Sequence, residues 1–214
     1  LRQIVMDGYD GVIAVMLSSG LSGTYNLVRL IGEECRGMLP VRVYDSLSGS
    51  LGMGMTLLQL AEDIRGGMGW EELTERRVPQ LIAGSHPFFS VDTLEYLLKG
   101  GRIGKVTATA GTLLQIKPII TFASDGQLQS VAKVRGRSQV MDKLVSMAVK
   151  ACGEHKRYNL AVANGGAPAE METVRQRLMT ALPDYDHIWE GEIDGTLSVY
   201  IGDGVLGAAV QVLD

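Results

Sequence analysis

Cysteine and histidine, which build most metal and redox sites, are scarce in this sequence. Its 214 residues contain only two cysteines, Cys35 and Cys152, and three histidines. The cysteines are far apart and lack the short spacing of metal-ligand pairs, so we expect reduced, partly buried thiols in helices. Glycine pairs such as Gly100-Gly101 occur, but neither the dinucleotide-binding fingerprint nor the P-loop does. The sequence therefore predicts no metal ion and no cofactor.

Long apolar runs are also missing. The most apolar stretch near the end of the chain, residues 197–213, is interrupted by Asp203 and by several glycines. A membrane-spanning helix would need about 18 uninterrupted apolar residues. The first residues also lack the basic, apolar and small-residue pattern of a signal peptide. We therefore predict a cytoplasmic protein without stable membrane insertion.

Positive charge is concentrated in one part of a chain whose formal net charge is -4. The segment 99–137 carries seven basic residues and one acidic residue, Asp125, for a net charge of +6, so the remainder carries -10. An acidic chain does not indicate nucleic-acid binding. The basic band favours an anionic ligand, a phosphate or an acidic partner surface, although solvated side chains that never converge would give the same count. Its bases are Lys99, Arg102, Lys105, Lys117, Lys133, Arg135 and Arg137.

The first part of the chain contains two β-α units in series. Residues 12–17 and 41–44 are short apolar runs typical of buried strands. Each is followed by a turn and a helical pattern, over residues 24–36 and 51–65, and a further amphipathic helix is predicted over 70–81. Repeated β-α units imply parallel strands joined by helical crossovers. We assign residues 1–80 to an α/β domain with a Rossmann-like parallel sheet.

Residues 81–214 have a different pattern, typical of an α+β domain. A short strand at 88–91 precedes a helix that is predicted to start at Asp92 and to end at Gly100-Gly101. Two apolar runs, 114–122 and 127–134, flank Asp125-Gly126, a strong hairpin signal. Further helices are predicted over 138–152 and 169–182, and further strands over 159–163, 187–193 and 197–201.

Both β-α turns carry serines and glycines at the carboxyl ends of their strands, where parallel sheets bind ligands. Serine hydroxyls and the free amides of a helix start can hold a carboxylate or a phosphate. A single serine at such a place is more typical of a helix cap or a turn, but two such turns side by side favour an anion site. The serines are Ser18, Ser19 and Ser22 in the first turn, and Ser46, Ser48 and Ser50 in the second.

The alternative is an acyl hydrolase or transferase that uses a serine of the loop 18–24 as its nucleophile. The segment Gly20-Leu21-Ser22-Gly23 lacks the glycine spacing of a nucleophile elbow. Among possible bases, His155 and His187 lie in polar stretches typical of exposed histidines, and only His86 remains. The residues therefore favour a binding site over a hydrolase.

Three ordered motifs resemble signatures of the DegV family. They are residues 18–26 (SSGLSGTYN), residues 92–103 (DTLEYLLKGGRI), and residues 114–119 (LQIKPI) with Asp125-Gly126 and 133–135 (KVR). Their order and spacing fit along essentially the whole chain. The resemblance implies an α/β domain with a parallel sheet, packed on an α+β domain, and one long-chain fatty acid buried between them.

The resemblance also implies a role. Family members bind a fatty acid, and some act with a separate, dihydroxyacetone-kinase-like fatty-acid kinase that converts the carboxyl group to an acyl phosphate. Such a member is a bacterial carrier without turnover of its own. Domain 1–80 would hold the head group, and domain 81–214 would cover the acyl chain.

The family pattern assigns roles to residues by position. Ser19 would hydrogen-bond the carboxylate, and Ser18 and Ser22 would shape the loop. Arg102 would lie near the head group, suited to a transferred phosphate or to the kinase surface. Without the resemblance, an arginine after a Gly-Gly helix end is slightly more typical of one that neutralises the last carbonyls. Arg135 would be a second basic residue on that side.

Two departures from the family pattern matter. The chain begins just before the first signature, so the family's opening strand and helix, with a second carboxylate ligand, are missing. We therefore expect a shortened, less stable parallel sheet. Near the end, Tyr200 stands where the family has a histidine within Thr-His-x-Gly-x-Gly. A tyrosine can donate a hydrogen bond to a carboxylate but stays neutral, with a pKa near ~10. The change is compatible with fatty-acid binding, but it removes the charge that a histidine could carry toward a kinase substrate.

Overall fold

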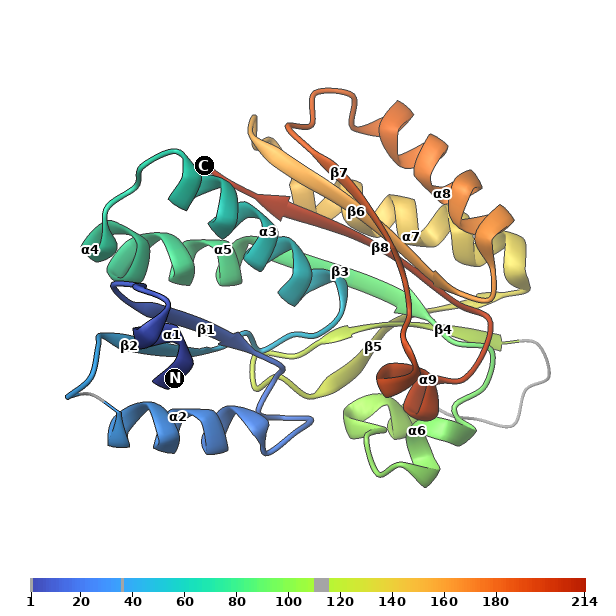
Figure 1. Cartoon of the computed structure of the whole chain (residues 1–214). Helices are drawn as coiled ribbons and strands as arrows, with labels where there is room; N and C mark the ends of the chain where they lie inside the picture. The colour runs from blue at the N-terminus through green and yellow to red at the C-terminus, as the bar shows by residue number, and fades with distance from the viewer. Residues whose placement is uncertain (1, 36, 110–115) are drawn as a thin grey trace.

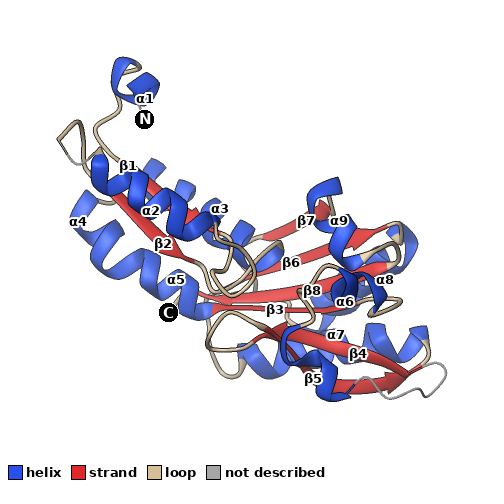
Figure 2. Ribbon diagram, turned by 90° about the horizontal axis from the view of Figure 1, so that it is seen from below, coloured by secondary structure: helices blue, strands red, loops and turns tan. Residues whose placement is uncertain are grey.

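The chain forms two β-sheets that are joined and covered by helices, as a computed structural model shows for residues 2–35, 37–109 and 116–214 (Figure 1). In the first sheet, β1 (Val12–Met16) and β2 (Val41–Asp45) pair in parallel, with Val12 opposite Val41. Helix α2 (Thr24–Glu34) connects them, so the predicted β-α unit with parallel strands is confirmed. Helix α1 (Arg2–Met6) precedes β1 and projects away from the rest of the chain in Figure 2.

The second sheet has six strands in the order β5-β4-β3-β8-β6-β7. Its pairs are antiparallel except β6 with β7, which is parallel, so the sheet is mixed. This arrangement agrees with the predicted α+β pattern. The strands are β3 (Ser85–Ser90), β4 (Ile116–Phe122), β5 (Leu128–Arg135), β6 (Tyr158–Gly165), β7 (Ile188–Glu192) and β8 (Val205–Val212).

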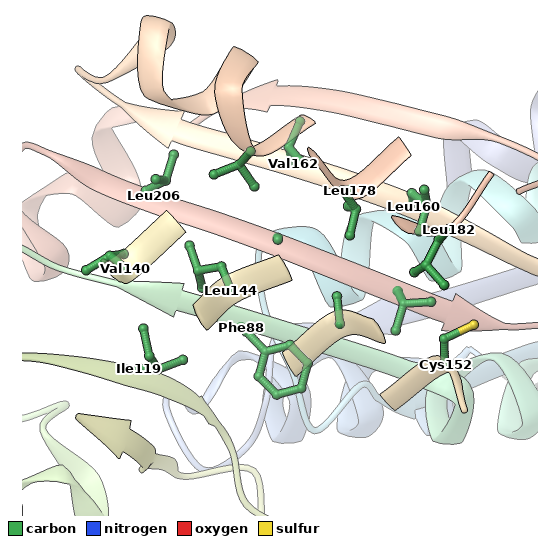
Figure 3. Packing of buried hydrophobic residues seen from close by; sticks show 14 of the residues in the cluster. Phe88, Ile119, Val140, Leu144, Cys152, Leu160, Val162, Leu178, Leu182 and Leu206 are labelled. Atoms are coloured by element: carbon green, nitrogen blue, oxygen red, sulfur yellow. The ribbon is translucent and has the colours of Figure 1, made fainter. Parts of the chain in front are cut away.

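Helices cover both faces of the second sheet. On one face, α7 (Arg137–Cys152) and α8 (Pro168–Ala181) pack on the strands through a large apolar cluster (Figure 3). Leu144 and Leu178 meet Leu160, Val162 and Leu206 in this cluster. On the other face lies α3 (Leu51–Arg65), which also contacts β1. The division into domains at residue 80 stays a prediction.

A buried polar cluster fixes α3 to the second sheet. Asn159 of β6 donates from Nδ2 to Oε1 of Gln59 at 2.8 Å, and Gln211 of β8 donates from Nε2 to Oγ1 of Thr56 at 3.4 Å. Asn159 and Gln211 have no exposed surface. Because unpaired buried polar groups cost free energy, these bonds restrict how α3 can sit on the strands.

The remaining helices are short. The helix predicted over 70–81 is confirmed and continues to residue 84, with a π-helical turn in its middle, as α4 (Trp70–Glu72), η1 (Leu73–Arg77) and α5 (Val78–Gly84). The others are α6 (Glu95–Lys99), η2 (Gly104–Thr109) and α9 (Gly195–Ile201). None of the helices within the described ranges has the length and apolarity needed to cross a membrane.

Two local predictions are wrong. Residues 197–201 are not a strand: they belong to helix α9, because the Asp194 carboxylate caps its start by accepting from the Leu197 amide at 3.1 Å. The helix predicted to start at Asp92 begins at Glu95, and Asp92 forms ion pairs instead. The predicted hairpin is confirmed for β4 and β5; its first residues, 114–115, lie outside the described residues, as does Arg36 of the predicted helix 24–36.

Candidate ligand-binding site

A cavity of about 280 Å³ lies between the first β-α turns, the second sheet and the helices α6 and α9. Its volume is close to the lower end of the range for ligand sites, about 300–1,000 Å³. The walls are mainly apolar: leucines, phenylalanines and isoleucines come from eight different elements or loops. Among them are Leu17, Leu21, Leu51, Phe88, Phe89, Leu97, Phe122, Leu128, Ile193, Leu197 and Ile201.

The few polar side chains of the lining are Ser22, Thr24, Ser50, Arg102, Thr196 and Tyr200. Three of them, Ser22, Arg102 and Tyr200, were predicted as site residues from the sequence. Thr24, Ser50 and Thr196 were not predicted. Ser50 stood in the second serine-rich turn and could have been singled out. Thr196 could not have been singled out, because the sequence predicted a loop at this position, between strands over 187–193 and 197–201.

Ser18 is fully buried and holds the first turn in place. Its Oγ donates to the carbonyl of Gly126 in the β4–β5 turn at 2.7 Å and accepts from the Gly20 amide at 3.1 Å. An added Cβ on Gly20 would come within 2.6 Å of the Gly126 backbone, so only glycine permits this approach. Ser18 therefore joins the first turn to the second sheet and does not line the cavity.

Ser19 lies on the exposed side of the same turn. Its amide donates to Oδ1 of Asp45 at 3.1 Å, and the Leu47 amide donates to the same oxygen at 2.9 Å. Asp45 thus links the two β-α turns and occupies two amides that could otherwise hold an anion. The hydroxyl of Ser19 is left as the group that this residue can offer to a ligand.

Ser22 is the serine of the first turn that reaches the cavity. Its Oγ lies 2.9 Å from Oγ1 of Thr24 and accepts from the Thr24 amide at 3.3 Å, just before α2 begins. Two hydroxyls therefore stand side by side at this wall. Such a pair can donate to one carboxylate without contributing a fixed charge.

The second turn approaches the cavity with a strained backbone. Ser50, the residue before α3, has φ 46° and ψ -118°, and Leu47 has φ 49°. Positive φ is unfavourable for residues other than glycine, and such strain persists where the surrounding structure enforces it, often at ligand sites. It places Ser50 in the wall of the cavity.

Arg102 and Tyr200 meet at the cavity. The Arg102 guanidinium lies 4.9 Å from the centroid of the Tyr200 ring. It also donates from Nη1 to the Gly100 carbonyl at 2.7 Å and from Nε to the Leu21 carbonyl at 3.2 Å. Arg102 therefore neutralises a carbonyl at the end of α6, as is typical of an arginine after a helix end, and it also reaches the first turn. Its role near a head group stays a prediction.

Tyrosines and glycines interlock α6 with α9. A Cβ added to Gly100, after α6, would lie 2.5 Å from the Tyr200 ring of α9. A Cβ added to Gly202, after α9, would lie 2.5 Å from the Tyr96 ring of α6. Each helix thus ends at a glycine that receives the tyrosine of the other, and this contact holds Tyr200 against the cavity.

Most of the basic band is paired rather than free. Lys99 pairs with Glu95, Lys105 with Asp125, Lys117 with Asp92, and Arg137 with both Asp92 and Glu170. Lys133 and Arg135 differ: their side chains are exposed, and neither forms an ion pair with the described residues. The band therefore does not converge on the cavity, to which it contributes only Arg102.

The histidines do not assist the serines. His155 contacts the Asp214 carboxylate at 3.1 Å, and His187 stacks on Trp189 with 5.6 Å between ring centroids. Burial, aided by the charge of His155, lowers the pKa of His86, but no histidine is part of the cavity lining described above. No group of three histidine, cysteine, aspartate or glutamate side chains within the described ranges is placed to hold a metal ion. The arrangement can bind an amphipathic acid, but it lacks the base that a serine nucleophile requires.

Comparison of the sequence with known families gives one match over nearly its whole length. The family model described as "Uncharacterised protein, DegV family" matches residues 1–212. A DegV domain-containing protein of Clostridium acetobutylicum is 34% identical over 98% of this chain and 73% of its own length. One of Clostridium perfringens is 33% identical over 99% of this chain and 74% of its own length.

Solved structures give the same result. A DegV family protein of Thermus thermophilus, described as fatty-acid binding, is 26% identical, with a TM-score of 0.90 over 99% of this chain and 74% of its own. A DegV family protein of Eubacterium eligens, loaded with heptadecanoic acid, is 26% identical, with a TM-score of 0.82 over 97% of this chain and 75% of its own. With its fold, its motifs and these relatives in agreement, the chain belongs to the DegV family.

Proposed function

We propose that this protein binds a long-chain fatty acid in the cavity, with the acyl chain against the apolar walls and the carboxyl group at the polar lining. One observation carries the proposal: a mainly apolar cavity whose hydroxyls and single arginine come from four separate parts of the chain. The description of the Eubacterium eligens relative with heptadecanoic acid supports the same ligand class.

The apolar walls would supply most of the affinity. Burial of one methylene contributes about 0.8 kcal/mol, so about ten buried methylenes contribute about 8 kcal/mol before the costs of association. A hydrogen bond to a carboxylate contributes about 1.5–3 kcal/mol. The polar residues therefore fix the orientation of the acid more than its affinity.

The carboxyl group would be held by hydroxyls and not by a buried ion pair. Ser22 and Tyr200 line the cavity and can donate to it, and Arg102, whose guanidinium lies 4.9 Å from the centroid of the Tyr200 ring, lines it too. The Ser19 hydroxyl is a further donor at the edge of the turn. Ser18 would act indirectly, because its own hydroxyl is engaged with the β4–β5 turn.

Mass spectrometry of the bound lipid tests this proposal. The protein is purified without detergent, denatured and extracted, and the organic phase is analysed; a second sample is delipidated and offered oleate and palmitate. We expect about one fatty acid per chain in both samples. A protein that carries none and takes up none would contradict the proposal.

We further propose that the protein acts as a cytoplasmic carrier that presents the carboxyl group to a fatty-acid kinase, which forms the acyl phosphate. Arg102 would contact the transferred phosphate or the kinase. Arg135 has an exposed side chain at the end of β5 with no ion-pair partner among the described residues, as expected of a partner contact. Such an exposed charge steers association more than it stabilises the fold.

Acyl-phosphate formation by a purified bacterial fatty-acid kinase tests the carrier role. The Arg135→Ala variant should retain the bound acid, but the rate of acyl-phosphate formation should fall to a small fraction of the wild-type rate when the concentration of the carrier limits the reaction. Lys150→Ala, which removes an equally exposed base from the end of α7, is the matched control and should leave the rate unchanged. Equal rates for the two variants would refute the role of Arg135.

A further inference from the structure

The sheet-side wall of the cavity contains unusually small residues. Gly207 of β8 stands opposite Phe89 of β3 and opposite Ala163 of β6, so the three share one face of the sheet, and all line the cavity. On the other face, their neighbours Leu206 and Ala208 pack in the core with α7 and α8. The cavity therefore extends to the backbone of β8 at Gly207.

Backbone geometry does not explain the glycine at position 207. Gly207 is not among the positive-φ glycines, unlike Gly204 at φ 76°. A Cβ built on Gly207 would lie 3.3 Å from Cδ1 of Leu51, with its next neighbours at 3.5 and 3.6 Å. An alanine would thus fit after a small shift of one flexible side chain. The lack of a side chain at position 207 therefore enlarges the cavity and is not needed to avoid backbone strain.

Leu51 closes this space on one side. It lines the cavity, and it also packs with Met55, Ala161 and Ala209 in a separate cluster under α3. Ala161 and Ala209 stand opposite each other, two residues along from Ala163 and Gly207 on the same face. Leu51 therefore separates the cavity from the small residues Ala161 and Ala209.

We infer that Ala163 and Gly207 set the room available to the acyl chain, and that Leu51 is the stop that limits its length. This inference rests on the proposed binding of a fatty acid. Enlarging the side chain at position 163 or 207 fills the space, and shortening Leu51 opens the stretch beyond it. The two kinds of change should therefore shift the preferred chain length in opposite directions.

The expected shifts follow from the carbons gained or lost. Ala163→Val adds two carbons to the wall and should shorten the preferred acid by about two carbons. Leu51→Ala removes three and should lengthen it by about two or three. Each methylene that can no longer be buried should weaken binding about fourfold. The exposed Leu58 of α3 provides a matched control, because Leu58→Ala makes the same change on the same helix away from the cavity.

Competition among fatty acids tests the inference. Delipidated wild-type protein and each variant are equilibrated with an equimolar mixture of straight-chain saturated acids, separated from free lipid, extracted and analysed by mass spectrometry. We expect shorter acids in Ala163→Val and Gly207→Ala, longer acids in Leu51→Ala, and the wild-type distribution in Leu58→Ala. In the double variant Gly207→Ala/Leu51→Ala, the two shifts should partly cancel, because the added methyl lies against the removed side chain.

The outcomes separate this inference from the proposed function. Wild-type protein that takes up no acid would contradict fatty-acid binding itself and the inference with it. If the wild-type protein binds fatty acids and the folded variants bind the same distribution of chain lengths as the wild type, only the inference would be overturned. Thermal melting identifies variants that fail to fold, and the milder Leu51→Val and Gly207→Ala then decide between a shifted and an unshifted distribution.

Discussion

Replacing Tyr200 by phenylalanine isolates one hydroxyl of the proposed site. The ring keeps its contact with Gly100 and its stacking 4.9 Å from the Arg102 guanidinium, so the interlock of α6 and α9 stays intact. Only the hydroxyl of this cavity-lining residue is removed. If it donates to a carboxylate, its loss costs about 1.5–3 kcal/mol and raises Kd by about 10- to 100-fold. The Tm of the ligand-free protein should not fall.

Titration of delipidated protein with a fluorescent fatty acid measures this effect. Tyr96→Phe is the matched control, because Tyr96 packs on Gly202 in the same interlock but does not line the cavity. A fatty alcohol of equal length provides the second control. Because it lacks the charged acceptor, its Kd should differ less between the wild-type protein and Tyr200→Phe than the Kd of the acid does. An unchanged Kd for the acid in Tyr200→Phe would refute the placement of the carboxyl group at this tyrosine.

Three further predictions concern the framework of the site. Asp63→Ala should lower the free energy of unfolding in urea titrations by about 3–5 kcal/mol, because it leaves the buried Arg77 without its carboxylate at 2.6 Å. The control Arg65→Ala removes an exposed ion pair on the same helix and should lower it by less than about 1 kcal/mol. Ser18→Ala should cost about 1–3 kcal/mol in the same assay, since the carbonyl in the β4–β5 turn loses its buried donor. Burial lowers the pKa of His86, so the folded protein favours the neutral imidazole. The stability that this preference contributes is fully present above the ordinary pKa of about 6.5 and is lost as the pH falls through the lowered pKa. Between pH 7 and 5, the Tm should therefore fall less in His86→Gln than in the wild-type protein.

The first sheet could be predicted because its signals are local. Each strand is followed at once by its turn and helix, so the apolar runs and the serines fixed both the parallel pairing and the position of the turns. The sequence could not show which serine of the first turn lines the cavity. Ser18, Ser19 and Ser22 differ by burial and by partners in remote segments, such as the carbonyl of Gly126, and those partners are set by tertiary packing.

The end of the chain was misread for two separate reasons. Val199 and Ile201 favour a strand by intrinsic preference, whereas the structure forms a helix whose start is capped by the Asp194 carboxylate. Strand β8 was missed because it lies in the middle of the sheet and is buried along its whole length. A strand covered on both faces shows no alternation, and Gly207, with Gly202 and Gly204 just before the strand, is typical of a loop.

The cavity depends on contacts between the two sheets that no single β-α unit can provide. Arg102 joins the end of α6 to the carbonyl of Leu21, and Ser18 joins the same turn to the β4–β5 hairpin. Tyr200 comes from α9, more than a hundred residues further along the chain than Ser22. Both bonds hold the first turn, with Ser22, against the part of the chain that carries Tyr200. For this reason we expect residues 1–80 alone to carry the serine signature without the binding site.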